Sequence, residues 1–213
     1  MTLEHTEEGR SARKRRMIME AATTLFLRNG YQGTSMDEIA TLAAASKQTL
    51  YKHFADKEAL FSAIVLGVAG TVESFLERIA TTLAEPKHLY ADLQDIARHY
   101  IKTVMQPQVL QMRRLLIGES ARFPELTREY YEKAPERVLA ALAPELKDLD
   151  KRGLLKVDDP VLAAKHFAFL ILGTPLDKAM FYGDEIGYSE EELMRLADEG
   201  VKAFLRAYRA DPS

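Results

Sequence analysis

The sequence predicts an all-α protein, and three features of its pattern support this. Apolar residues recur at spacings of three and four along most of the 213 residues, as on one face of an α-helix. Serine followed three residues later by glutamate, the capping box that starts a helix, occurs at Ser35–Glu38 and Ser189–Glu192. No stretch alternates apolar and polar residues as a half-buried strand does. We therefore expect about nine or ten helices and no sheet.

The N-terminal third should contain four helices. The first spans residues 12–28 and ends at Asn29-Gly30, because glycine commonly follows a helix C-terminus. A short helix then covers 35–43, and another covers 46–53 with Ser46 as its N-cap. A long helix begins at Asp56 and continues to about residue 84.

The rest of the chain continues in helices. We expect them over residues 89–105, 107–121, a short segment from 124, 135–152, 160–182 and 189–208. Asp159 before Pro160 is a suitable N-cap and first-turn pair. Pro144 should kink or split its helix, because an interior proline removes a backbone hydrogen bond and clashes with the preceding turn. Residues 173–175, Gly-Thr-Pro, should bend theirs.

Composition excludes several classes of protein. Apolar residues make up 47% and the formal net charge is only −3, which argues against a disordered chain. The absence of cysteine excludes a disulfide scaffold, a thiolate metal site and a cysteine nucleophile. No apolar run approaches the roughly 18 residues of a membrane span, and the N-terminus lacks the apolar core of a signal peptide. We therefore expect a cytoplasmic protein without a membrane partner.

Residues 34–54 carry the pattern that indicates function. Two short helices joined by three or four residues have the spacing of a helix-turn-helix. Met36, Ile39, Ala40 and Ala43 of the first helix, and Leu50 and Phe54 of the second, can face inward. The polar side chains of the second helix then face outward, which suits the major groove of DNA. By spacing alone, a helical hairpin in an ordinary bundle is an equal alternative.

The residues themselves resemble the N-terminal domain of TetR-family (TetR/AcrR-like) transcriptional regulators. The matching residues are Ile18, Ala21-Ala22, Leu25-Phe26, Gly30-Tyr31, Thr34-Ser35, Ile39-Ala40, Ala43, Ser46-Lys47, Thr49-Leu50-Tyr51, His53-Phe54, Lys57-Glu58 and Leu60. The resemblance implies a DNA-binding domain over 11–71, with its helix-turn-helix at 34–53, and a helical ligand-binding and dimerisation domain over 72–213.

The turn between the two short helices departs from the family pattern. The family usually has glycine followed by a branched apolar residue, whereas this chain has Ala44-Ala45. If position 44 needs a left-handed backbone, alanine costs roughly 1 kcal/mol relative to glycine. A packed domain tolerates that cost.

The resemblance also assigns roles in DNA binding. The N-terminal end of the recognition helix approaches the bases, with Gln48 the best candidate for direct readout, and its C-terminal part holds phosphates. Thr34 and Ser35 offer hydroxyls and amides to a phosphate at a helix N-terminus, and Lys57 adds a further phosphate contact. The complete predicted set is Thr34, Ser35, Ser46, Lys47, Gln48, Thr49, Tyr51, Lys52, His53, Lys57, Arg13 and Arg16.

A basic cluster precedes this motif. Its members are Arg10, Arg13, Lys14, Arg15 and Arg16. They form either an arm that follows the DNA backbone or enters the minor groove, or simply a solvated start to the first helix. Residues 10–57 hold nine Lys/Arg against four Asp/Glu, a charge of +5, so the chain's net −3 averages over a basic segment and an acidic remainder.

The C-terminal part resembles the AefR-like branch of the family at residues 113–126, at Gly153 and at 158–160. A homodimer would place two recognition helices about one turn of DNA apart, roughly 34–36 Å. The last two long helices are the predicted interface, although their side chains alternatively fill the subunit's own core. The predicted interface residues are Ala164, Phe167, Ala168, Ile171, Leu172, Leu193, Leu196, Ala197, Phe204 and Leu205.

A ligand pocket between helices should be mostly apolar with a few polar groups. The candidates, each of which alternatively serves ordinary packing or the surface, are His99, Tyr100, Met112, Glu119, Arg122, Phe123, Tyr130 and Phe169. No cofactor or metal is expected.

Together these observations predict a ligand-responsive repressor that binds a palindromic double-stranded DNA operator as a homodimer. A small apolar or amphipathic effector releases it by shifting the population of DNA-competent dimers. The alternative is an all-helical small-molecule carrier without DNA binding. An enzyme is disfavoured, because the five histidines form no HExxH pair and the chain has no glycine-rich phosphate loop or serine elbow.

Overall fold

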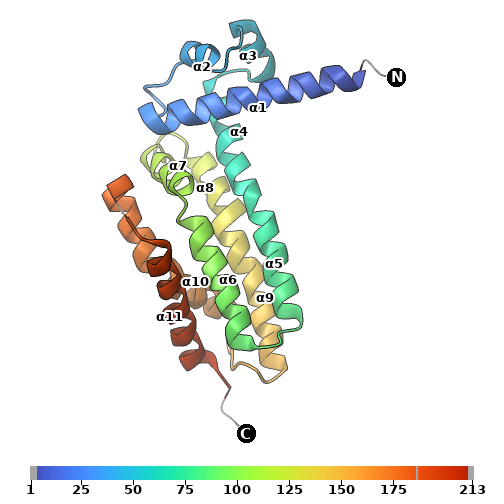
Figure 1. Ribbon diagram of the computed structural model, residues 1–213, viewed down its shortest axis with the longest axis vertical. Coiled ribbons are helices and arrows are strands. Elements are labelled where there is room, and N and C mark those ends of the chain that lie inside the picture. The colour runs from blue at the N-terminus through green and yellow to red at the C-terminus, as the bar shows by residue number, and fades with distance from the viewer. Residues whose placement is uncertain (1–3, 186, 211–213) are drawn as a thin grey trace. The chain divides into compact units, whose positions relative to one another are not determined.

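The computed structural model describes residues 4–185 and 187–210, and within them the chain is almost entirely helical (Figure 1). The helices are α1 (Glu4–Asn29), α2 (Met36–Leu42), α3 (Lys47–His53), α4 (Lys57–Ala69), α5 (Glu73–Ala84), α6 (Leu89–Val104), α7 (Pro107–Gly118), α8 (Pro124–Tyr131), α9 (Arg137–Lys151), α10 (Pro160–Tyr182) and α11 (Glu190–Tyr208). The described residues hold a single isolated antiparallel bridge, Leu155 to Arg209, and no strand. The predicted all-α fold is confirmed.

Three short helical segments complete the description. Single 3-10 turns cover Gly70–Val72 (η1) and Gly183–Glu185 (η3), and a π-helical turn covers Glu132–Glu136 (η2). The long helix expected from Asp56 to residue 84 is therefore interrupted by η1, which separates α4 from α5.

The chain divides into two compact units. The first comprises Met1–Val68 and Leu115–Thr127, and the second comprises Ala69–Arg114 and Arg128–Ser213. The sequence predicted a domain boundary at residue 71, close to the point at which the chain passes from the first unit to the second. It also placed residues 115–127 in the C-terminal domain. The structure groups this segment with the N-terminal unit.

An aromatic cluster explains why the segment belongs there. The Phe123 ring lies 4.7 Å from that of Tyr31 and 5.5 Å from that of Phe61, centroid to centroid. Phe26 stacks on Tyr31 at 5.8 Å and meets Phe61 edge-on at 5.2 Å. Pairs of this kind contribute about 0.5–1.5 kcal/mol beyond the area that they bury, so the cluster ties α1, α4 and 115–127 into one core.

In the second unit, α6 packs on α11, α10 on both α9 and α11, and α5 on α9 (Figure 1). Phe167 of α10 and Phe204 of α11 are fully buried and meet edge-on at 5.2 Å. α10 and α11 approach closely at Gly200, where an added Cβ would lie 2.9 Å from the Leu170 carbonyl oxygen.

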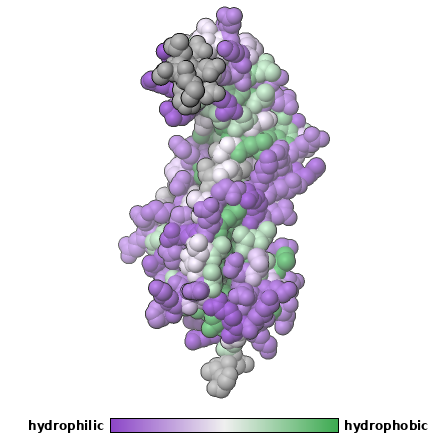
Figure 2. All heavy atoms as spheres, turned by 90° about the vertical axis from the view of Figure 1, so that its right-hand side faces the viewer, coloured by the Kyte–Doolittle hydropathy of each residue, from purple (hydrophilic) through white to green (hydrophobic). Residues whose placement is uncertain are grey.

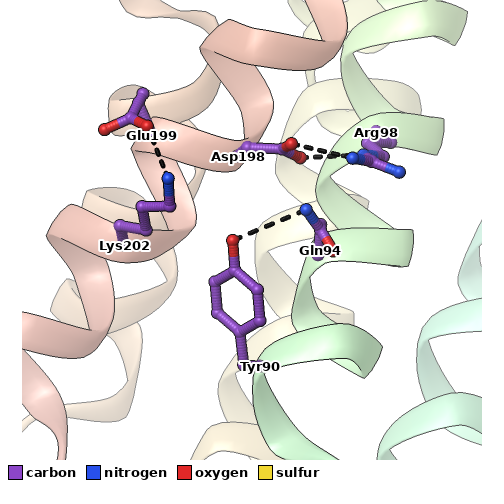
Figure 3. Close-up of polar contacts among 6 residues, drawn as sticks. All are labelled: Tyr90, Gln94, Arg98, Asp198, Glu199 and Lys202. Carbon is purple, nitrogen blue, oxygen red and sulfur yellow. Dashed lines mark hydrogen bonds and ion pairs between the residues drawn. The ribbon is translucent and has the colours of Figure 1, made fainter.

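Polar contacts link α6 to α11 along the edge of this core (Figure 3). The Arg98 guanidinium donates to both carboxylate oxygens of Asp198, at 2.8 and 2.7 Å. Tyr90 accepts a hydrogen bond from Gln94, and Lys202 pairs with Glu199 within α11. The hydrogen bond from Arg98 is the main reason that the pKa of Asp198 lies below its ordinary value.

The local signals for helix starts are confirmed. Ser35 and Ser189 each form a complete capping box, and the Asp159 carboxylate accepts from two amides of the first turn of α10. α10 runs without interruption from Pro160 to Tyr182, and the predicted bend at 173–175 remains a prediction.

The predicted split of the helix at Pro144 is wrong, because α9 continues through it, and a kink there remains a prediction. Pro144 and Ala140, the residue whose carbonyl loses its partner, both face solvent, so water can satisfy the freed oxygen. The irregularity occurs instead around Pro135, in the π-helical turn η2.

In the part of the chain that the structure describes, no helix is long and apolar enough to cross a membrane. The face drawn in Figure 2 is largely hydrophilic, with apolar side chains gathered in patches among the polar ones.

Gly200→Ala should destabilise the second unit by about 1–3 kcal/mol, because its Cβ would meet backbone rather than a movable side chain. The free energy of unfolding in urea is the measurement. Gly67→Ala, inside α4 with its nearest neighbour at 3.8 Å, is the control and should be neutral or stabilising. Equal midpoints for Gly200→Ala and wild type would contradict the close approach of α10 and α11.

Asp198→Asn should lower the free energy of unfolding by about 0.5–1 kcal/mol at pH 7, since the pair is partly exposed and screened. A carboxyl whose folded-state pKa is lowered stabilises the protein above its unfolded-state pKa, and loses this effect as pH falls through the folded value. Urea unfolding should therefore show the wild-type advantage at pH 7 and its disappearance in strong acid. Glu191→Gln, at an exposed position on the same helix, is the control and should show no comparable effect. A pH-independent difference would contradict this assignment.

Candidate nucleic-acid interface

The helix-turn-helix begins with a capped α2. The Glu38 amide donates to Ser35 Oγ at 3.2 Å, and the Ser35 amide donates to the Glu38 carboxylate at 2.9 Å. The Ser35 hydroxyl also donates to that carboxylate, which lowers the pKa of Glu38. Ser35 is exposed, but its hydroxyl already serves the cap.

The side chains of α3 that are buried and those that are exposed are the ones that the sequence predicts. Ser46 accepts from the Thr49 amide at 3.1 Å and so caps the helix, while Leu50 and Phe54 are buried. The remaining side chains of α3 face outward: Lys47, Gln48, Tyr51 and Lys52 are exposed, and Thr49 and His53 are half-buried. The structure thus gathers seven of the predicted DNA-binding residues on one short helix and its cap.

An ion pair joins the two helices of the motif. Lys47 Nζ lies 2.7 Å from an Asp37 carboxylate oxygen, and this contact raises the pKa of Lys47. Both side chains are well exposed, so the pair contributes little to stability. Its consequence is electrostatic: one lysine of α3 is partly neutralised, whereas Lys52 and the neutral Gln48 face solvent.

The turn between α2 and α3 has the left-handed backbone considered above. Ala44 has φ 46° and is the only non-glycine residue with a positive φ in the described part of the chain. Its amide donates to Thr41, and the Ala45 amide donates back to Ala40 at 2.9 Å. Alanine therefore occupies a position that favours glycine, at the cost of roughly 1 kcal/mol.

Two residues of the predicted DNA-binding set turn inward. Thr34 is 2% exposed, and its hydroxyl donates to the Gly30 carbonyl at 2.9 Å. Lys57 Nζ donates to the Tyr31 and Thr34 carbonyls, at 2.9 and 2.8 Å, and lies over the Tyr31 ring. These polar atoms hold the loop between α1 and α2 instead of facing solvent, where a phosphate would bind.

The basic cluster is helical. All five residues lie within α1, so the segment is not an extended arm. Arg10, Arg13, Arg15 and Arg16 are exposed, while Lys14 is half-buried. The Arg15 guanidinium lies over the Phe54 ring, 5.1 Å from its centroid, a contact that local sequence signals did not indicate.

Comparison with known proteins identifies the family to which this helix-turn-helix belongs. Residues 18–64 match the model of the tetR family of bacterial regulatory proteins, and residues 91–210 match that of the AefR-like transcriptional repressor, C-terminal domain. This chain belongs to the TetR family. It is therefore a helix-turn-helix transcriptional regulator with an AefR-like C-terminal domain.

Several solved structures resemble most of this chain. A putative regulator from Mesorhizobium loti MAFF303099 is 47% identical, with 94% of this chain and 99% of that one covered and a TM-score of 0.85. The flavonoid-responsive regulator FrrA is 33% identical over 93% and 98%, at 0.71. AibR, solved with isovaleryl coenzyme A and operator DNA, is 26% identical over 89% and 97%, at 0.61.

In this regulator the predicted pocket residues divide between the two units. Glu119, Arg122 and Phe123 lie in segment 115–127 of the first unit, where Arg122 pairs with Glu119 at 3.2 Å and Phe123 joins the aromatic cluster. Phe169, on α10, is 78% exposed and lines no interior space.

The other predicted pocket residues lie in the second unit: Met112, Tyr100 and Tyr130 are buried and His99 is half-buried. Burial raises the pKa of Tyr100 to about 12 and also raises that of Tyr130, an effect that Arg113 partly offsets through its charge. His99 stacks beside Phe75 at 5.3 Å, and burial lowers its pKa.

Most of the predicted interface residues of this regulator belong to the subunit's own core, which was the stated alternative. Ala164, Phe167, Ile171, Leu172, Ala197 and Phe204 are buried within one chain. Ala168, Leu193, Leu196 and Leu205 are partly buried against the same core. These side chains pack α10 on α9 and α11.

The sequence patterns did not predict that α10 carries large apolar side chains that are exposed in the single chain. They are Val161, Leu162, Phe169, Leu170 and Phe181. Because α10 is apolar on nearly all sides, its periodicity does not distinguish the face that packs inward from the face that remains outside.

Proposed function

We propose that this regulator is a ligand-responsive repressor that acts in the cytoplasm and binds a palindromic operator as a homodimer. The observation that carries the DNA-binding part is α3, a capped surface helix anchored by Leu50 that presents a row of polar side chains to solvent. The solved complex of its relative AibR with operator DNA supports this proposal.

Within α3 we assign different roles to two residues. Gln48, exposed in the first turn, suits bidentate hydrogen bonding to an adenine in the major groove. Lys52, one turn further, supplies a positive charge to a phosphate and so fixes register without reading sequence. Thr49, Tyr51 and His53 complete the contact surface, with Arg13 and Arg16 of α1 as further phosphate contacts.

Gln48→Ala should weaken operator binding about 5- to 150-fold for each subunit of the dimer, corresponding to about 1–3 kcal/mol per bidentate base contact, and should leave the salt dependence unchanged. Lys52→Ala should weaken binding to all sequences alike and reduce the slope of log affinity against log salt by about 0.9 per subunit, or about 1.8 for the dimer. Gel shifts with the promoter region of the regulator's own gene, over a salt series, measure both.

Glu85→Ala, in the second unit, is the control and should bind as wild type. Absence of any shift by the wild-type protein at low salt, across a library of genomic fragments, would overturn DNA binding and favour the carrier alternative.

The proposed dimer forms through the exposed face of α10. Phe169 is 78% exposed in the single chain, and Leu162 and Leu170 of the same helix are exposed as well. Exposed apolar surface of this kind marks interaction sites. A two-fold axis at α10 would pair the same patch on both copies, as an isologous interface requires.

The exchange Phe169→Glu should convert the dimer to monomers, because pairing would bury a carboxylate from each copy. Sedimentation velocity measures the oligomeric state, and operator affinity should fall in parallel. Phe169→Leu is the matched control and should remain dimeric. A dimeric Phe169→Glu protein, or a monomeric wild type, would contradict the interface.

The proposed effector is a small apolar or amphipathic molecule bound in the second unit. Tyr100 supplies a hydroxyl group within the apolar core of this unit, Tyr130 supplies a second buried one, and Arg113 interacts with both. A few such polar groups in apolar surroundings orient ligands. The flavonoid-responsive FrrA and the isovaleryl coenzyme A complex of AibR support an effector-binding role for this unit.

A further inference from the structure

The turn of the helix-turn-helix receives a hydrogen bond from outside the motif. Lys14 Nζ, on α1, donates to the Ala44 carbonyl oxygen at 2.8 Å. Thirty residues separate the two partners in sequence. Of the five basic residues in the cluster, Lys14 alone is half-buried, and the other four are exposed.

The accepting peptide is the strained one. Ala44 has φ 46°, a backbone conformation that L-residues with a side chain rarely adopt and that surrounding structure must maintain. It lies two residues before the Ser46 cap, so the orientation of the Ala44 peptide determines where α3 begins relative to α2. A hydrogen bond from an ammonium group is stronger than one from a neutral donor, which suits this task.

The neighbouring residue acts at the other end of the same helix. Arg15 covers the ring of Phe54, the C-cap of α3, at 5.1 Å from the ring centroid. Consecutive residues of α1 therefore contact the turn before α3 and the residue that ends it. Within this unit α1 packs on α2 (Figure 1), and its contact with the end of α3 is made by Arg15.

We propose that Lys14 is a positioning residue for DNA recognition. It holds the Ala44 carbonyl and thereby the left-handed turn that sets α3 at its angle to α2, and its charge is not a phosphate contact. Alanine in the turn creates the need for this hydrogen bond, because glycine would adopt the same conformation without strain. The inference rests on the proposed function, in which α3 reads the operator.

Operator affinity measured over a salt series distinguishes a Lys14 that holds the turn from a Lys14 that contacts a phosphate. Lys14→Met should weaken binding roughly three- to tenfold with an unchanged salt slope, since no phosphate contact is lost. The double variant Lys14→Met/Ala44→Gly should recover most of that affinity. Arg13→Met, on the exposed side of α1, is the matched control and should reduce the slope by about 0.9 per subunit, or about 1.8 for the dimer. A reduced slope for Lys14→Met without recovery by Ala44→Gly would overturn the proposal.

A second measurement needs no DNA. In amide proton–nitrogen spectra of the full-length free protein, Lys14→Met should shift the resonances of residues 43–46, while Arg13→Met should leave them in place. The double variant should reproduce the positions seen with Ala44→Gly alone. Unmoved resonances in Lys14→Met would overturn the positioning role even if the operator is bound normally. Failure of wild type to bind DNA would instead overturn the proposed function.

Discussion

The burial of Leu50 and Phe54 is the constraint on which the DNA-binding unit depends. α3 has seven residues, and a helix of that length is not stable in water by itself. It exists because its two apolar side chains enter a core built from α1, α2 and α4, and because Ser46 satisfies an amide of its first turn. Its polar side chains face solvent as a consequence of that anchoring.

The same core decides what Thr34 and Lys57 do. Family resemblance and residue type both suggest phosphate contacts, yet their polar atoms bind the carbonyls of residues 30, 31 and 34. Lys57 also lies over Tyr31, the ring at the centre of the aromatic cluster. The loop that leads from α1 to α2 is thus fixed from inside, and polar residue types alone do not indicate this.

The features that sequence predicts well are those determined within a few residues. The capping boxes at Ser35 and Ser189 and the Asp159-Pro160 start involve partners no more than three positions apart, and all are present. The outward face of α3 follows from the spacing of its two apolar residues.

What sequence did not predict depends on distant partners. Lys14 meets Ala44 across thirty residues, and Phe123 meets Tyr31 across most of the first half of the chain. The exposed face of α10 is also undetermined locally, because that helix is apolar on nearly every side and only its packing against α9 and α11 selects the inner face. At Pro144, the exposed position of Ala140 lets water bind the freed carbonyl, which offsets the lost hydrogen bond.

The discontinuous first unit has a consequence for recombination between relatives. A chimera that takes its DNA-binding part from one regulator and its C-terminal part from another, joined near residue 71, would combine a Tyr31 ring from one parent with segment 115–127 from the other. Phe123 would then come from one parent, and the other three rings of the cluster from the other. A chimera that keeps the aromatic cluster intact therefore needs two grafts, and the second is the thirteen-residue segment 115–127, which lies within the sequence of the C-terminal part.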